Sequence, residues 1–114
     1  MEEQDVTALI EELVQYAQLL DARFDDQNSV LLLSVATQVR ETVTPLYEVL
    51  EEGPKPWKHG YGGAWVAMRS AGSIEEELSQ PDMDWERVAA AVAFTVSGLE
   101  QMAAGWSKTL GRDT

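Results

Sequence analysis

Apolar side chains recur every three or four residues in four long stretches of this sequence. An α-helix turns once every 3.6 residues, so this spacing places the apolar side chains of each stretch on one face of a helix. Polar side chains occupy most of the positions between them and would face water. The pattern therefore predicts four amphipathic helices, over residues 6–24, 30–50, 64–78 and 85–110.

Each predicted helix has its own stripe of core positions. The stripes of the first two helices are Val6, Leu9, Leu13, Tyr16 or Ala17, Leu20 and Phe24, then Leu32, Val35 or Ala36, Val39, Val43, Leu46 and Leu50. Those of the last two are Trp65, Met68, Ala71 or Gly72 and Leu78, then Trp85, Val88, Val92, Thr95 or Val96, Leu99, Met102 or Ala103, Trp106 and Leu110. In this register residues 75–77, all Glu, lie in water.

Helix boundaries follow from capping and turn-forming residues. Asp5 is placed to cap the first helix, and the polar residues 25–29 break it and start the next one. Asp82 or Asp84 caps the fourth helix, because both stand just before its apolar stripe. Short turns of this kind join neighbouring helices as antiparallel hairpins.

Two features interrupt the helical pattern. Pro45 lies inside the second predicted helix, where it lacks a backbone donor, so we expect a kink or a restart with Thr44 as the new cap. Residues 53–63 hold four of the eight Gly and two of the four Pro, so we expect a long irregular connection there.

Four amphipathic helices cannot each hide an apolar stripe alone. Joined by two short turns and one long connection, they pack most simply as an all-α, up-and-down antiparallel four-helix bundle. A chain of 114 residues is of single-domain size, so we expect one helical domain over residues 1–114.

The charge of the chain is strongly negative and unevenly spread. The net charge is −12, of which residues 1–52 carry −10 with twelve acidic and two basic side chains. This charge repels phosphate backbones and anionic lipid, so we expect neither nucleic acid nor membrane as a partner. Between Glu52 and Glu75 the sequence has no acidic residue, but it has the basic residues Lys55, Lys58 and Arg69. This acid-free stretch is a local inversion of the charge.

Composition also bears on the compartment of the protein. The sequence has no Cys, and its first residues are acidic where a signal peptide requires a basic start. No run of apolar residues in the sequence comes close to the ~20 that a membrane-spanning helix needs. We therefore expect a cytoplasmic protein; its oligomeric state is not readable from the sequence.

Candidate chemistry is limited by the residue types present. One His, no Cys and no Glu-x-x-His pair leave no di-iron or zinc site, so we expect no cofactor and no metal. The acids that could hold magnesium in a small carboxylate-dependent hydrolase or nucleotide-handling enzyme are Glu11, Glu12, Glu75, Glu76, Glu77, Asp82 and Asp84. Most of them fall on the wet faces of the predicted helices. We therefore expect no catalytic residues. The alternative is that the protein is a small carboxylate-dependent hydrolase or nucleotide-handling enzyme.

Five residues in and beside the acid-free stretch form the candidate binding site. They are Trp57, Lys58, His59, Tyr61 and Trp65. The aromatic side chains offer large rigid contact areas to a partner, and no nearby acid in the sequence cancels the basic side chains. The structural alternative is that the three aromatic residues fold over the open end of the bundle and leave Lys58 and His59 merely exposed.

The last two-thirds of the chain resemble a known family, most clearly from Thr44 onward. Residues 44–47, Thr-Pro-Leu-Tyr, precede residues 54–59, Pro-Lys-Pro-Trp-Lys-His, and residues 85–88, Trp-Glu-Arg-Val, open the last helix. This order is similar to that of the YppE-like bacterial four-helix bundles. The sequence departs from that pattern at Gly60, Gly62 and Gly63. The resemblance implies a four-helix bundle and carries over neither an activity nor a catalytic residue.

These features together favour a non-catalytic protein-interaction or adaptor module whose partner is another protein. A second alternative beside the hydrolase is an acidic mimic of nucleic acid that occupies a basic partner, based on the −10 charge of residues 1–52.

The lone His and missing Cys make metal content a direct test. We expect the purified protein to contain no stoichiometric zinc or iron by elemental analysis. Tight binding of either metal at one ion per chain would mean that the carboxylates had been misinterpreted.

Overall fold

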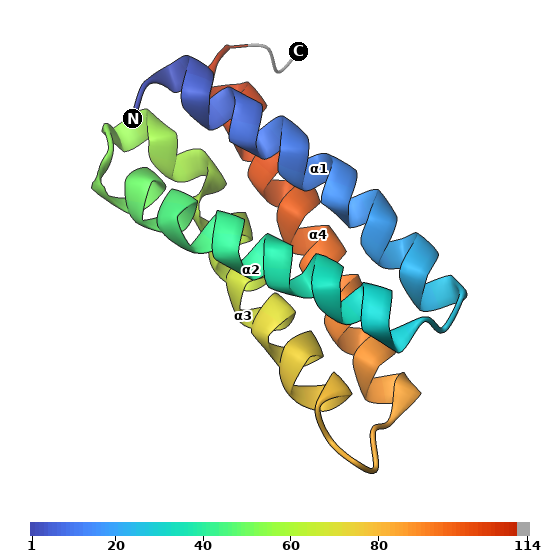
Figure 1. The fold of residues 1–114 in the computed structure, drawn as a ribbon. Coiled ribbons are helices and arrows are strands. Elements are labelled where there is room, and N and C mark those ends of the chain that lie inside the picture. The colour runs from blue at the N-terminus through green and yellow to red at the C-terminus, as the bar shows by residue number, and fades with distance from the viewer. Residues whose placement is uncertain (112–114) are drawn as a thin grey trace.

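The computed structural model describes residues 1–111, which form four long helices and one short 3₁₀ helix (Figure 1). The long helices are α1 (Glu3–Asp25), α2 (Ser29–Glu52), α3 (Tyr61–Leu78) and α4 (Trp85–Thr109). The 3₁₀ helix, η1, spans Lys55–Gly60 between α2 and α3. No strand occurs in residues 1–111, which confirms the predicted all-α four-helix fold.

The helices form a square in which each contacts two neighbours. α1 packs on α2 and α4, and α3 packs on α2 and α4, with the α3–α4 interface the most extensive. Consecutive helices run in opposite directions, so the bundle is up-and-down (Figure 1). Helix η1 packs mainly on α4 and lies at the end of the bundle that also holds the N-terminus and the end of α4.

Two of the predicted helix starts are confirmed and one is shifted. Asn28 and Asp84 cap α2 and α4, since their side chains accept hydrogen bonds from the backbone N–H groups of Leu31 and Glu86 at 3.0 and 2.9 Å. α1 starts earlier than predicted, with Glu2 as its N-cap. Asp5 lies inside the first turn and accepts from the backbone N–H of Glu2 at 3.3 Å.

The predicted restart at Pro45 is wrong, because α2 continues through it as one helix. Thr44 is not a new cap, and its hydroxyl donates to the carbonyl oxygen of Arg40 at 2.7 Å. Val43 and Leu46, on either side of Pro45, are fully buried. Burial of these side chains on one continuous stripe offsets the hydrogen bond that Pro45 removes.

The core of α1, α2 and α4 follows the predicted stripes closely. On α1 the structure buries Ile10 in place of the predicted Leu9, which is half-buried. The remaining fully or nearly fully buried side chains of these three helices include Val6, Leu13, Ala17, Leu20, Leu32, Ala36, Val39, Val43, Leu46, Leu50, Val88, Val92, Thr95, Leu99, Met102 and Trp106.

The predicted core stripe of α3 is confirmed at Ala71 and wrong at Trp65. Its buried side chains are Ala64, Ala67, Ala71 and Ile74, whereas Trp65 is 45% exposed. The helix also begins at Tyr61, so residues 61–63 are helical and not part of an irregular connection. The core-facing side of α3 is lined mainly by small residues, whereas the sequence analysis assigned the core positions to the larger side chains.

Small residues on α3 allow an unusually close approach to α4. A Cβ at Gly98 of α4 would lie 2.8 Å from the backbone nitrogen of Ala67 and 2.8 Å from the carbonyl oxygen of Gly63. A Cβ at Gly63 would lie 2.5 Å from the carbonyl oxygen of Gly98. Real Cβ atoms do not sit this close to backbone, so both positions require glycine for steric reasons and not for an unusual φ.

Adding one methyl group therefore has opposite effects at two glycines of the bundle. Gly98→Ala forces α3 and α4 apart and should lower the free energy of unfolding by about 1–3 kcal/mol. Gly72→Ala adds the same group where no atom lies within 4 Å, so it should leave stability unchanged or raise it by up to ~1 kcal/mol. Chemical denaturation of both variants measures the difference. A Gly98→Ala variant as stable as the parent would contradict this packing.

Candidate functional site

The structure separates the five predicted site residues into two groups. Lys58 and His59 on η1 are exposed, and so is Trp65 on α3. Trp57 and Tyr61 are half-buried against the bundle. The predicted closure of the open end thus applies to Trp57 and Tyr61, but the expectation that Trp65 folds over the core is wrong.

Helix η1 is fastened to the end of α4 through its backbone. The Thr109 hydroxyl donates to the carbonyl oxygen of Pro56 at 2.6 Å. Gly105 lies directly against the His59 carbonyl, and a Cβ there would collide with it and lie 2.9 Å from the backbone nitrogen of Gly60. These contacts fix the backbone that carries Lys58 and His59, so the two side chains project from a held position.

Trp57 anchors the other side of η1. Its ring meets the ring of Trp106 edge to face, with centroids 5.3 Å apart and an interplanar angle of 80°. The indole N–H of Trp106 donates to the Thr7 hydroxyl of α1 at 2.8 Å. Trp57 therefore connects η1 to α4 and, through Trp106, to α1, which is a structural role.

Tyr61 pairs with Tyr47 of α2. The rings stack with centroids 4.9 Å apart, and the two hydroxyl oxygens are 2.8 Å apart in a hydrogen bond. This hydrogen bond raises the pKa of Tyr47 to about 12, and burial, the Tyr61 charge and the Glu51 carboxylate act in the same direction. The pair joins α2 to the first turn of α3 and keeps Tyr61 away from solvent contacts.

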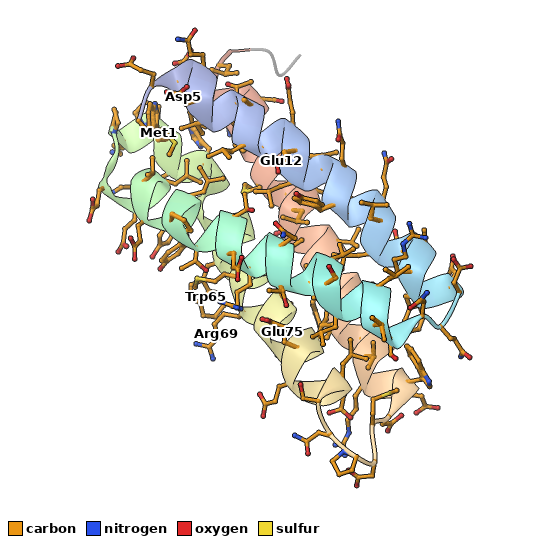
Figure 2. All side chains as sticks on the ribbon, in the orientation of Figure 1. Met1, Asp5, Glu12, Trp65, Arg69 and Glu75 are labelled. Carbon is orange, nitrogen blue, oxygen red and sulfur yellow. The ribbon has the colours of Figure 1, made fainter. Side chains whose placement is uncertain are left out.

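Trp65 stands on the outer side of α3 beside Arg69, as Figure 2 shows. The guanidinium carbon of Arg69 lies 5.5 Å from the centroid of the Trp65 ring, a cation–π contact one helical turn along. The arginine holds the ring in place without burying it. An exposed tryptophan supported in this way is pre-positioned for contact with another molecule.

The exposed basic and aromatic side chains lie on η1 and α3. Gly62, Trp65 and Arg69 of α3 are exposed and recur at steps of three and four residues, which is the spacing of one helical face. Lys58, also exposed, precedes them on η1. Beside Lys58, an open depression of about 440 Å³ is lined by Lys55, Pro56, Lys58 and His59. We call the exposed residues Lys55, Lys58, His59, Gly62, Trp65 and Arg69 the cationic surface.

Three members of the cationic surface, Lys55, Gly62 and Arg69, lie outside the five predicted residues. Lys55 and Arg69 belong to the acid-free stretch already noted in the sequence. Gly62 could have been found by its helical spacing to Trp65, if residues 61–63 had been taken as helical and not as a turn.

Several of the acidic residues considered for catalysis have structural partners. Glu75 was expected in water, but it forms a part-buried ion pair with Arg40 of α2 and accepts from the Thr37 hydroxyl at 2.9 Å (Figure 2). Glu77 accepts from the backbone N–H of Asp84 at 3.0 Å, and Asp84 itself caps α4. Within residues 1–111, no three His, Asp or Glu side chains gather as a group that could hold a metal ion.

α4 has the length and apolar composition of a membrane span, the one helix of residues 1–111 that does. The sequence analysis did not anticipate this. The same helix supplies Val88, Leu99 and Met102 to the fully buried core, and a core helix of a bundle has a similar composition.

Comparison with known proteins gives no relative from which a site could be transferred. No protein-family model, no curated protein and no solved structure matches this chain. The functional argument therefore depends on the geometry and charge of the cationic surface.

The tyrosine pair makes a titration prediction. Tyr61→Phe removes the hydroxyl that raises the pKa of Tyr47, so the pKa of Tyr47 should fall from about 12 toward its ordinary value. Ultraviolet absorbance of tyrosinate measures this shift. Tyr16 is an internal control, because its pKa is raised by a hydrogen bond to Glu12 that the substitution leaves intact.

The same shift makes stability depend on pH. Because the folded pKa of Tyr47 lies above its unfolded value, the contribution of the pair is fully present below about pH 10 and is lost as the pH rises through about 12. The melting temperature of the parent should fall more steeply in this window than that of Tyr61→Phe. Parallel curves for the two proteins would contradict the assignment.

Proposed function

We propose that this protein is a non-catalytic interaction module that binds a partner protein through the cationic surface. The observation that carries the proposal is the exposed Trp65, which Arg69 contacts on the outer side of α3. Tryptophan and arginine are the residues most enriched in the energetic centres of protein interfaces. Here they stand on a regular helix that packs tightly on α4.

Charge supports the same surface. The protein carries −12 overall, yet Lys55, Lys58 and Arg69 occur in a stretch with no acidic residue. At physiological ionic strength the Debye length is about 8 Å, so the acids of distant parts of a molecule 44 Å long are largely screened at this surface. A partner bound at this surface therefore contacts basic side chains, although the protein as a whole is acidic.

The structural roles of the acids favour an interaction module over the hydrolase alternative. Glu75 joins α2 to α3, and Glu77 and Asp84 fix the turn between α3 and α4. Glu12 accepts from the Tyr16 hydroxyl at 2.9 Å. Carboxylates engaged in these contacts are held in place by the fold, and they are distributed over separate helices.

Charge reversal at Lys58 tests the proposal. A partner obtained by pull-down from the native cytoplasm is identified and purified, and its affinity is measured by calorimetry. Lys58→Glu should weaken binding by roughly tenfold at unchanged melting temperature, because the side chain is exposed and packs on nothing that the fold needs. Added salt should weaken the parent in the same direction.

The matched control is Arg87→Glu, which makes the same charge change on an exposed side chain at the start of α4. This variant should bind like the parent. If both variants bind like the parent, while neutralising acids of residues 1–52 abolishes binding, the working surface is the acidic half and the mimicry alternative replaces this proposal.

A further inference from the structure

Most glycines on the α3–α4 side of the bundle are explained by packing. Gly63 and Gly98 let α3 and α4 approach each other closely, and Gly105 leaves room for the His59 carbonyl group. A Cβ added at Gly60 would lie 3.2 Å from the carbonyl oxygen of Met102. At each of these positions a side chain would meet backbone. The fold itself therefore requires a small residue there.

Gly62 has no such explanation. A Cβ at this position would meet no atom within 4 Å, and its φ is outside the left-handed region that favours glycine. The residue is exposed in the first turn of α3, where glycine is a poorer helix former than nearly any alternative. Nothing within residues 1–111 needs glycine here, so its bare backbone is available to a contact from outside.

The neighbours of Gly62 define what that contact would be. On the same exposed face of α3, Trp65 lies one turn after it and Arg69 a further turn along, and the exposed Lys58 lies on η1 four residues before it. Bare backbone is thus flanked by an aromatic ring and two cations. Beyond its first turn the backbone amides of α3 are bonded within the helix, so an added β-strand has no row of free backbone groups to pair with.

Within this molecule, a close helix crossing at glycine already packs α3 against α4. Gly98 of α4 sits against the backbone at Gly63 of α3, and the two helices approach closely because neither residue has a side chain. Gly62 directly precedes Gly63 in the chain and is exposed on the outer side of α3. It offers an external helix the kind of close crossing that Gly63 offers α4.

Resting on the proposed function, we infer that the partner segment is an acidic amphipathic helix that crosses α3 at Gly62. Its apolar side packs on Trp65, and its carboxylates reach Lys58 and Arg69. Lys58 precedes the crossing on η1 and Arg69 follows it on α3, so the partner's acids lie on both sides of the crossing.

The net charge of −12 further restricts this partner. A broadly acidic surface would be repelled by the exposed carboxylates of α2, among them Glu48 and Glu51. The partner's acids are therefore confined to the edges of its contact face. Such an arrangement gives specificity, because misplaced acids meet like charge.

A synthetic peptide tests the inference without knowledge of the natural partner. The probe is a fluorescent peptide of about 20 residues, long enough to form a helix, with Leu and Ala on one side and Glu at its edges. A second peptide has Lys in place of every Glu. Binding is followed by fluorescence anisotropy, and helix formation by circular dichroism.

The parent should bind the Glu peptide with a gain in helicity and bind the Lys peptide more weakly at this surface. Gly62→Ala should weaken the Glu peptide roughly tenfold, because one methyl group separates the two backbones. Its melting temperature should not fall, since the new Cβ meets nothing in the fold. Gly72→Ala, the matched control with equally open space, should bind like the parent.

Each departure has a distinct meaning. If Lys58→Glu weakens the Glu peptide but Gly62→Ala does not, the cationic surface binds and the crossing at Gly62 is overturned while the proposed function stands. If the parent fails to bind the Glu peptide, or binds it without a gain in helicity, the acidic helix is overturned as the occupant. If sedimentation shows the parent to be a dimer that Gly62→Ala disperses, the occupant is a second copy, and the inference of an acidic partner is overturned.

Discussion

The close approach of α3 to α4 is the contact on which the rest of this structure depends. Gly63 and Gly98 meet without side chains between them, and the alanines of α3 continue the same seam. Because α3 buries small residues here, its larger side chains are displaced to its flanks and outer face. The outward position of Trp65, and with it the cationic surface, is thus a result of core packing.

The end of the bundle shows the same constraint. Gly105 allows η1 to lie against α4, and the Thr109 hydroxyl holds the Pro56 carbonyl. A segment with two prolines and several glycines is commonly a mobile loop, yet here its backbone is packed and hydrogen-bonded. Lys58 and His59 therefore project from a rigid base, which lowers the entropy lost when a partner immobilises them.

The sequence was sufficient for the number of helices and for three of their four core faces, because large apolar side chains at helical spacing mark those faces directly. It was insufficient for α3. There the decisive residues are Gly and Ala, whose burial arises from backbone proximity to α4, a property that appears only when both helices are placed. The effect of Pro45 was predicted wrongly for a related reason. The hydrogen bond that proline removes is visible in the local sequence, whereas the burial of Val43 and Leu46 depends on the helices packed around them. Of the candidate site, Lys58, His59 and Trp65 lie on the exposed surface, and Trp57 and Tyr61 brace it.

The indole of Trp106 links parts of the chain that are far apart in sequence. Its N–H is bonded to Thr7 in α1, and its ring meets Trp57 in η1, so one side chain bridges the first helix and the base of the cationic surface. α1 makes less extensive interfaces with its neighbours than α3 and α4 make with each other. Local opening would therefore begin with α1, and its departure would leave the Trp106 N–H without its acceptor and η1 without part of its support. The attachment of the amino-terminal helix thus sets how firmly η1 presents the charges of Lys58 and His59.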